Sequence, residues 1–111
     1  IYLLTHGPVP LMPGVEKMLK LLSDANKRRC VVTHSDRDLV NIIRSKNPLL
    51  DTIPFWVTRF DYSEPKPSSE CYLKAVATYG KEGDRIIGFE DTPRGMKALL
   101  GAPVKPVMVS A

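Results

Sequence analysis

The sequence predicts an α/β fold in which a parallel β-sheet carries helices on both faces. Short runs rich in β-branched residues, each expected to form a strand, alternate with segments whose apolar residues recur at helical spacing. Strands separated by helices form βαβ units, in which the strands pair in parallel and the helices cover the sheet. The 111 residues suffice for one compact domain with a single core, and they contain no internal repeat.

The first helix and the first buried strand are expected between Pro13 and Thr33. Pro13 suits the first turn of a helix, because its missing N–H would have no helical partner there. The apolar residues of this helix are Val15, Met18, Leu19 and Leu22. The helix should end near Asn26, and the run "CVVT" at 30–33 then predicts a strand that is buried on both faces.

A second helix and a more exposed strand are expected next. Ser35 and Asp38 have the spacing of a capping box at the start of a helix, which should end before Pro48. The run "FWVTRF" at 55–60 mixes aromatic, β-branched and polar residues, so it predicts a partly exposed strand.

Two more helices and two more strands complete the pattern. The apolar residues of the next helix are Tyr72, Ala75, Val76 and Tyr79. Gly80 should end this helix, and "RIIGF" at 85–89 predicts another buried strand. Thr92 can cap the last helix with Pro93 in its first turn, and Gly101 should end it before a strand over "PVMV".

The first dozen residues fit this pattern poorly. We expect residues 1–12 to be a linker that arrives from an upstream segment, and residues 13–111 to form the core. Because residue 1 is Ile and not Met, we also expect the chain to be part of a longer protein.

Composition and charge restrict the kind of protein. Hydrophobic residues make up 43% and charged residues 25%, and no apolar run is long enough to cross a membrane. Cys30 and Cys71 lack the spacing of a metal or redox motif, which favours a reduced, cytoplasmic protein. The net charge of +4 suits an anionic ligand but is spread thinly. A nucleic-acid-binding domain has no support beyond this charge, so we expect no nucleic-acid partner.

Three polar groups follow predicted strands, at the ends where ligands bind in an open parallel sheet. Because parallel strands end at the same edge of a sheet, the three groups should meet there. The groups are Thr33, His34 and Ser35 after the first buried strand, Lys66 after the aromatic strand, and Glu90 with Asp91 after "RIIGF".

Each group has a chemical interpretation and a simpler structural one. A hydroxyl of Thr33 or Ser35 before a helix N-terminus can hold a phosphate, although Ser35 could equally be a helix cap. Lys66, between two prolines, can neutralise a phosphoryl group or be an ordinary surface lysine. Glu90 and Asp91 supply the ligands that Mg²⁺ prefers, but would also favour the N-terminal end of the following helix.

Taken together and in this order, the three groups resemble the haloacid dehalogenase-like hydrolase superfamily. The segments "VVTHS", "KPSSECY" and "GFEDTPRGMKAL" are similar to the second, third and fourth motifs of that family. The similarity is greatest to the branch that holds phosphoglycolate phosphatase and β-phosphoglucomutase. It implies a three-layer, Rossmann-like core.

The resemblance also implies a role for each group. Thr33, with His34 and Ser35 beside it, would bind the transferring phosphoryl group. Lys66 would be the catalytic lysine that neutralises charge, and it would also contact the phosphate. The acidic pair would hold Mg²⁺. His34 stands where many relatives have Asn or another small polar residue, a difference that would alter the pocket.

One family motif is not found in the sequence. The first motif is an Asp-x-Asp pair on the first core strand, whose first Asp is the nucleophile. Asp36 and Asp38 have that spacing, but they begin a helix. The resemblance places the first strand between the strands that lead to Thr33 and Glu90. We therefore expect an incomplete core that lacks this strand and the cap, and that needs an N-terminal segment of the same protein to complete the sheet.

These observations predict an enzyme, a Mg²⁺-dependent phosphatase that acts on a small phosphorylated metabolite. The reaction would pass through an aspartyl-phosphate intermediate, with the nucleophile outside this chain, so the chain alone should be inactive. A phosphomutase of the same family is an alternative because it shares the three motifs. A 2-haloacid dehalogenase is disfavoured because it needs no Mg²⁺. The alternative from another class is a non-catalytic scaffold that binds phosphate and metal.

Overall fold

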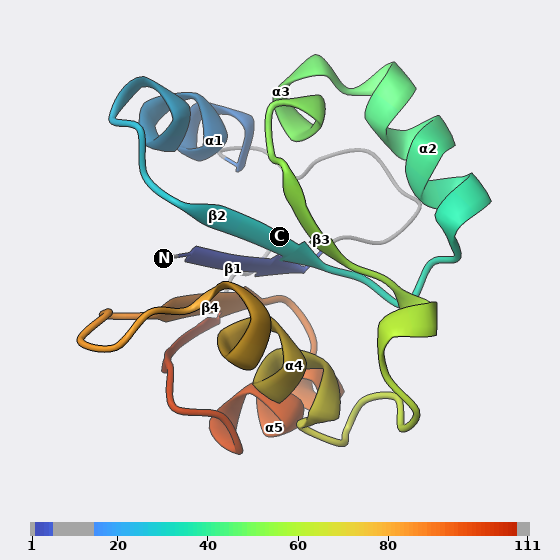
Figure 1. Cartoon of the computed structure of the whole chain (residues 1–111), viewed down its shortest axis with the longest axis vertical. Coiled ribbons are helices and arrows are strands. Elements are labelled where there is room, and N and C mark those ends of the chain that lie inside the picture. Colours follow the sequence, from blue (N-terminus) through green and yellow to red (C-terminus); the bar gives the residue numbers. More distant parts are fainter. Residues whose placement is uncertain (1, 6–14, 109–111) are drawn as a thin grey trace.

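The computed structural model describes residues 2–5 and 15–108, and Figure 1 shows them as a β-sheet between two layers of helices. The strands are β1 (Tyr2–Thr5), β2 (Arg29–Val32), β3 (Phe55–Val57), β4 (Ile87–Glu90) and β5 (Lys105–Met108). The helices are α1 (Val15–Asp24), α2 (Arg37–Lys46), α3 (Pro48–Asp51), the 3-10 helix η1 (Arg59–Asp61), α4 (Glu70–Tyr79) and α5 (Pro93–Leu100). The strands pair in parallel in the order β3-β2-β1-β4-β5, which confirms the predicted α/β fold.

Helices cover both faces of the sheet. α1, α2 and α3 lie on one face, and α4 and α5 lie on the other (Figure 1). Along β2, Cys30 and Val32 belong to the core beneath α4 and α5, whereas Val31 belongs to the core on the opposite face. All three side chains are fully buried, as expected of a strand that is covered on both faces.

The centre of the sheet is occupied by β1, which lies between β2 and β4. Leu4 is in register with Val31 on one side and with Phe89 on the other. The prediction that a strand belongs at this position is confirmed, but the expectation that the position would be empty is wrong. Residues 2–5 were expected to be linker; they form the strand because β2 and β4 need a partner for their backbone N–H and C=O groups. Residues 6–12 of the expected linker lie outside the described residues.

The aromatic run after α3 differs from the sequence-based expectation. Its strand ends at Val57, and the chain then turns into η1. The side chain of Asp61 causes this turn, because its Oδ2 accepts a hydrogen bond from the Thr58 backbone N–H at 2.7 Å. Trp56 and Val57 are buried, so β3 is less exposed than predicted even though it is an edge strand.

The helix ends agree with the sequence patterns at most positions. The Thr92 hydroxyl caps α5 by accepting a hydrogen bond from the Gly95 N–H at 3.0 Å, and Pro93 lies in the first turn. Gly80 ends α4, as predicted. Within the described ranges, no helix is long and apolar enough to cross a membrane.

Candidate functional site

The predicted site residues lie at one edge of the sheet. Thr33 directly follows β2, and Glu90 is the last residue of β4. Both strands run parallel to β1, which separates them. Adjacent strands are about 4.8 Å apart, so the two strand ends are separated by about 10 Å. This distance is short enough for one small phosphorylated ligand to reach both.

The turn after β2 is held by its own hydroxyl groups. The Thr33 N–H donates to the Val57 carbonyl at 2.9 Å, and its side chain is buried. The Thr33 Oγ1 accepts a hydrogen bond from the Ser35 N–H at 3.2 Å and lies 3.1 Å from the Ser35 Oγ. The two hydroxyl groups therefore form a compact polar turn at the site edge.

The start of α2 corrects one sequence-based interpretation. The helix is capped by Asp36, whose Oδ1 accepts a hydrogen bond from the Leu39 N–H at 2.8 Å. Ser35 is not the cap, because its hydroxyl is directed to Thr33. The interpretation of Asp36 and Asp38 as part of a helix start, and not as a displaced first motif, is confirmed.

His34 and Tyr62 extend the polar turn outward. His34 is exposed, and its Nδ1 lies 2.8 Å from the Tyr62 hydroxyl. That hydroxyl also donates to the Thr33 carbonyl at 3.3 Å, so Tyr62 contacts both His34 and Thr33. Burial raises the pKa of Tyr62 to about 12, which keeps the hydroxyl protonated at neutral pH. No periodicity or motif in the sequence pointed to Tyr62.

The second half of the site is an ion pair between the partly buried Lys66 and the buried Glu90. The Lys66 Nζ lies 2.7 Å from the Glu90 Oε2, and the Tyr72 hydroxyl donates to the same oxygen at 2.5 Å. The other carboxylate oxygen, Oε1, accepts a hydrogen bond from the Asp91 N–H at 3.1 Å. Glu90 is only 1% exposed, so these contacts replace the water that it loses on folding.

The ion pair fixes the charge of Glu90. Burial alone raises the pKa of its carboxyl group, but the hydrogen bonds from Lys66 and Tyr72 outweigh burial and hold that pKa below its ordinary value. The ammonium group of Lys66 also lies 5.1 Å from the centre of the Tyr72 ring. Glu90 is therefore a carboxylate at neutral pH, and it directs Lys66 to the site edge.

Gly95 makes room for this carboxylate. A Cβ atom at position 95 would lie only 1.9 Å from the Glu90 carboxyl carbon, so any larger residue would displace it. The sequence signal was present in "EDTPRG", where Gly stands in the first turn of a helix, but the reason for it appears only in three dimensions.

The acidic pair, Glu90 and Asp91, can supply only a few oxygen ligands to a metal ion. Asp91 is exposed beside the ion pair, and the Glu90 Oε1 accepts a hydrogen bond from the Asp91 backbone N–H. No group of three or more His, Cys, Asp or Glu side chains that could hold a metal is found in the described part of the chain. One or two carboxylates fit Mg²⁺, which keeps several waters and binds phosphate oxygens.

The strand at the centre of the edge carries no carboxylate. The residues of β1 are "YLLT", so neither Asp of an Asp-x-Asp pair lies on the strand between β2 and β4. Among the described residues, the site therefore has a hydroxyl turn, a lysine and an acidic pair.

Comparison with known proteins shows the family of the chain. The model of the haloacid dehalogenase-like hydrolase family matches residues 4–109. The chain belongs to this family. A Bacillus subtilis (strain 168) protein named "Putative phosphatase YhcW" is 31% identical over 97 residues, which are 87% of this chain and 44% of that protein.

Solved structures of this family show the same fold. A HAD hydrolase of family IA, variant 3, from Entamoeba histolytica is 26% identical, with a TM-score of 0.71, and the match covers 93% of this chain and 47% of that one. The β-phosphoglucomutase of Clostridium difficile is 21% identical, with a TM-score of 0.76 and coverage of 91% and 44%. A predicted phosphoglycolate phosphatase from Haemophilus somnus is 19% identical, with a TM-score of 0.76 and coverage of 89% and 44%. The chain thus spans about half the length of these relatives.

Proposed function

We propose that the protein to which this chain belongs is a Mg²⁺-dependent phosphatase that acts on a small phosphorylated metabolite. The observation that carries this proposal is the ion pair between Lys66 and the buried Glu90, at the same sheet edge as Thr33. A cation that is held by a buried carboxylate needs no reorganisation when a phosphate arrives, which is the condition for effective electrostatic stabilisation.

The described residues bind and orient the phosphoryl group in this proposal. The turn of Thr33, His34 and Ser35 binds the oxygens that are not transferred, and Lys66 neutralises charge on the phosphoryl group. The nucleophile is an Asp carboxylate outside this chain. Its oxygen forms a bond to phosphorus while the bond to the leaving alcohol breaks, and water then cleaves the aspartyl phosphate to release inorganic phosphate.

Asp91 and the Glu90 Oε1 are the atoms that would hold Mg²⁺. The ion, when bound, would offset the repulsion between the attacking carboxylate and the phosphate. Because the pair supplies few protein ligands, phosphate oxygens and water would complete the coordination.

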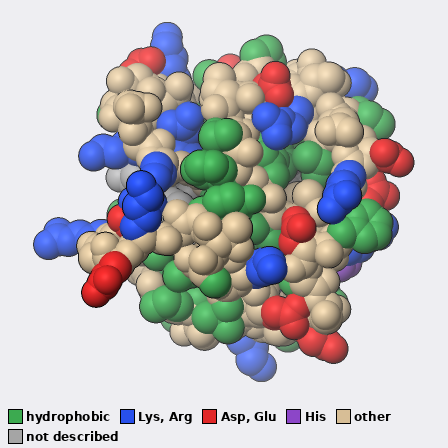
Figure 2. All heavy atoms as spheres, in the orientation of Figure 1, with side chains coloured by type: hydrophobic (Ala, Val, Ile, Leu, Met, Phe, Trp, Pro, Cys, Tyr) green, Lys and Arg blue, Asp and Glu red, His purple; other side chains and the backbone are tan. Residues whose placement is uncertain are grey.

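Two further properties belong to the same proposal. Figure 2 shows Lys and Arg side chains dispersed among acidic and apolar ones on the face that it displays, an arrangement that favours a small anionic ligand over nucleic acid. Cys30 and Cys71 are buried free thiols, and burial raises the pKa of Cys30 to about 12. Unreactive thiols of this kind are compatible with the cytoplasmic location that we propose.

The test is phosphate release by the longer protein that contains this chain, from p-nitrophenyl phosphate and from small sugar phosphates, with and without Mg²⁺. Lys66→Met should lower kcat by about 100-fold or more, because it removes one preorganised charge. Lys74→Met, which changes an exposed lysine of α4, is the matched control. Unchanged turnover in Lys66→Met would refute the proposal, and turnover by the 111-residue chain alone would show that the nucleophile lies within it.

A phosphomutase is the second candidate, because the β-phosphoglucomutase of Clostridium difficile has the same fold. Isomerisation of a sugar phosphate without release of inorganic phosphate would decide for it. The absence of a carboxylate on β1 supports a third candidate, a non-catalytic module that binds phosphate and metal. Phosphate binding without turnover by the longer protein would decide for this module.

A further inference from the structure

Lys66 lies in a loop that joins η1 to α4 and crosses the site edge. At its beginning, the Tyr62 hydroxyl donates to the Thr33 carbonyl, which follows β2. In its middle, Lys66 contacts Glu90 at the end of β4. The loop therefore connects the two halves of the site, and its conformation determines where the ammonium group lies.

Glu70, in the first turn of α4, binds the backbone of this loop. Its Oε2 accepts hydrogen bonds from the Ser63 N–H and from the Glu64 N–H, the latter at 3.3 Å. One carboxylate oxygen thus holds two successive amides that lie before Lys66, while Glu70 itself lies after it. Hydrogen bonds to an ionised acceptor are roughly twice as strong as neutral ones, so this contact closes the loop around Lys66.

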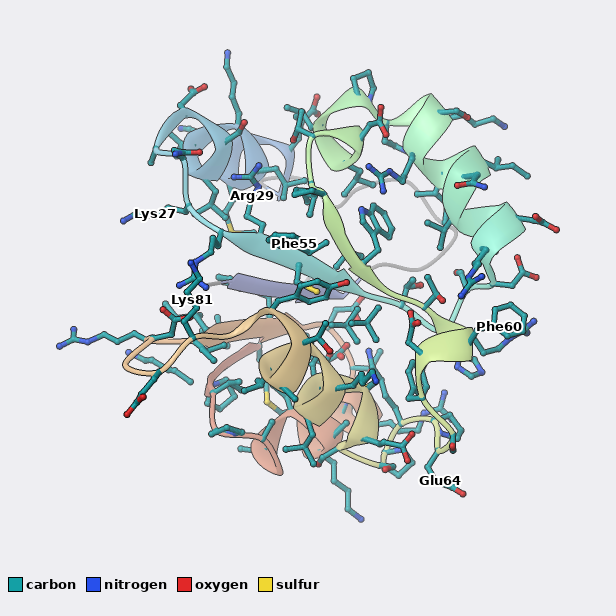
Figure 3. The ribbon with its side chains drawn as sticks, in the orientation of Figure 1. Lys27, Arg29, Phe55, Phe60, Glu64 and Lys81 are labelled. Atoms are coloured by element: carbon teal, nitrogen blue, oxygen red, sulfur yellow. The ribbon has the colours of Figure 1, made fainter. Side chains whose placement is uncertain are left out.

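Two contacts inside the loop show that it is folded back on itself. The Ser68 N–H donates to the Pro65 carbonyl at 3.0 Å, and the Glu70 N–H donates to the Ser68 Oγ at 3.2 Å. Glu64 lies at the outer side of the loop and points away from the ribbon (Figure 3). The carboxylate of Glu70, in contrast, contacts the loop backbone.

We propose that Glu70 is a positioning residue, which places Lys66 for phosphate by fixing the amides of Ser63 and Glu64. This inference rests on the proposed function of Lys66. When the Glu70 carboxylate is replaced by an amide, two backbone donors lose a charged acceptor, and the loop can leave the conformation in which Lys66 reaches Glu90.

The test compares Glu70→Gln with Glu16→Gln in the longer protein that contains this chain. Glu16 also lies in the first turn of its helix, α1, on the other face of the sheet, so its variant controls for the loss of a negative charge at a helix start. Two readouts do not depend on catalysis: amide hydrogen exchange at Ser63 and Glu64, and the ¹⁵N NMR signal of the Lys66 ammonium group. We expect faster exchange at both amides and a shifted or broadened ammonium signal in Glu70→Gln alone.

Binding of inorganic phosphate then connects the loop to function. We expect Glu70→Gln to weaken binding by about tenfold, in line with the loss of charge-assisted hydrogen bonds. In a Lys66→Met background the same change should have no further effect, because Glu70 acts through Lys66. An equal effect in both backgrounds, or an unchanged ammonium signal in Glu70→Gln, overturns the inference.

The outcomes also separate this inference from the proposed function. If Lys66→Met leaves phosphate binding unchanged, the proposed function fails, and the ammonium signal alone decides whether Glu70 positions Lys66. If Glu70→Gln does not fold, Glu70→Asp replaces it, because Asp keeps the negative charge but has a shorter side chain. A Lys66 ammonium signal like that of the unmodified protein would then overturn the inference.

Discussion

Glu90 depends on Lys66 for its charge, and Lys66→Met tests this dependence. Met has nearly the length of Lys but carries no charge. In the variant, the Glu90 carboxylate, which is 1% exposed, would keep its hydrogen bonds from the Tyr72 hydroxyl and the Asp91 N–H but would lose its cation. Removing one partner of a buried ion pair costs about 3–5 kcal/mol of stability. A domain of this kind is stable by about 5–15 kcal/mol, so the loss at neutral pH should be large.

The variant should also reverse the pH dependence that Glu90 contributes. In the unmodified protein the folded-state pKa of Glu90 lies below the ordinary value of 4.5. Its contribution to stability is therefore complete above that value, and it is lost as the pH falls through the folded-state pKa. Without Lys66, burial dominates and raises the folded-state pKa. Glu90 then binds a proton more readily in the folded state, so stability should rise as the pH falls from 7 towards 5.

Urea-induced unfolding of the longer protein at several pH values from 5 to 8 measures both effects. Lys74→Met is the control for the loss of a lysine, because its side chain is exposed. The double variant Lys66→Met/Glu90→Gln should recover much of the stability at pH 7, since it no longer buries an unpaired charge. Equal pH profiles for Lys66→Met and Lys74→Met would refute the reasoning.

Two further changes test other parts of the site. Gly95→Ala places a Cβ atom against the Glu90 carboxylate, so it should lower the free energy of unfolding, measured with urea, by about 1–3 kcal/mol. It should also weaken phosphate binding, measured by calorimetry. Unchanged values for both would show that Glu90 can move freely. Asp91→Asn should weaken Mg²⁺ binding by about tenfold or more without a change in the unfolding midpoint, because Asp91 is exposed. Asp24→Asn, at an exposed position at the end of α1, should leave Mg²⁺ binding unchanged, and an equal loss in both variants would exclude a specific role for Asp91.

The order of the predicted strands and helices could be foreseen because each of those elements has a local signal. "CVVT" and "RIIGF" are too apolar for exposed strands, and Thr92-Pro93 marks a helix start by side-chain chemistry alone. The meeting of Thr33, Lys66 and Glu90 at one edge was predictable from the rule that parallel strands end together.

What the sequence did not show depends on contacts between distant residues. "YLLT" is too short to show a strand period, and its place in the sheet is set by pairing with β2 and β4. The choice of Asp36 over Ser35 as helix cap follows from the hydroxyl contact between Ser35 and Thr33. The hydrogen bonds from the loop amides to Glu70 depend on how the backbone folds back on itself, and no local sequence pattern predicts this.

The position of β1 has a consequence for how the molecule is assembled. Among the described residues, β2 pairs with β3, and β4 pairs with β5. These two pairs of strands are joined through β1. Tyr2 pairs with Ile87, so the contact between β1 and β4 joins residues that are far apart in the sequence. Such contacts raise the contact order of the fold. Tyr2–Thr5 thus act as the spacer that sets the distance between the strand ends at which Thr33 and Glu90 lie.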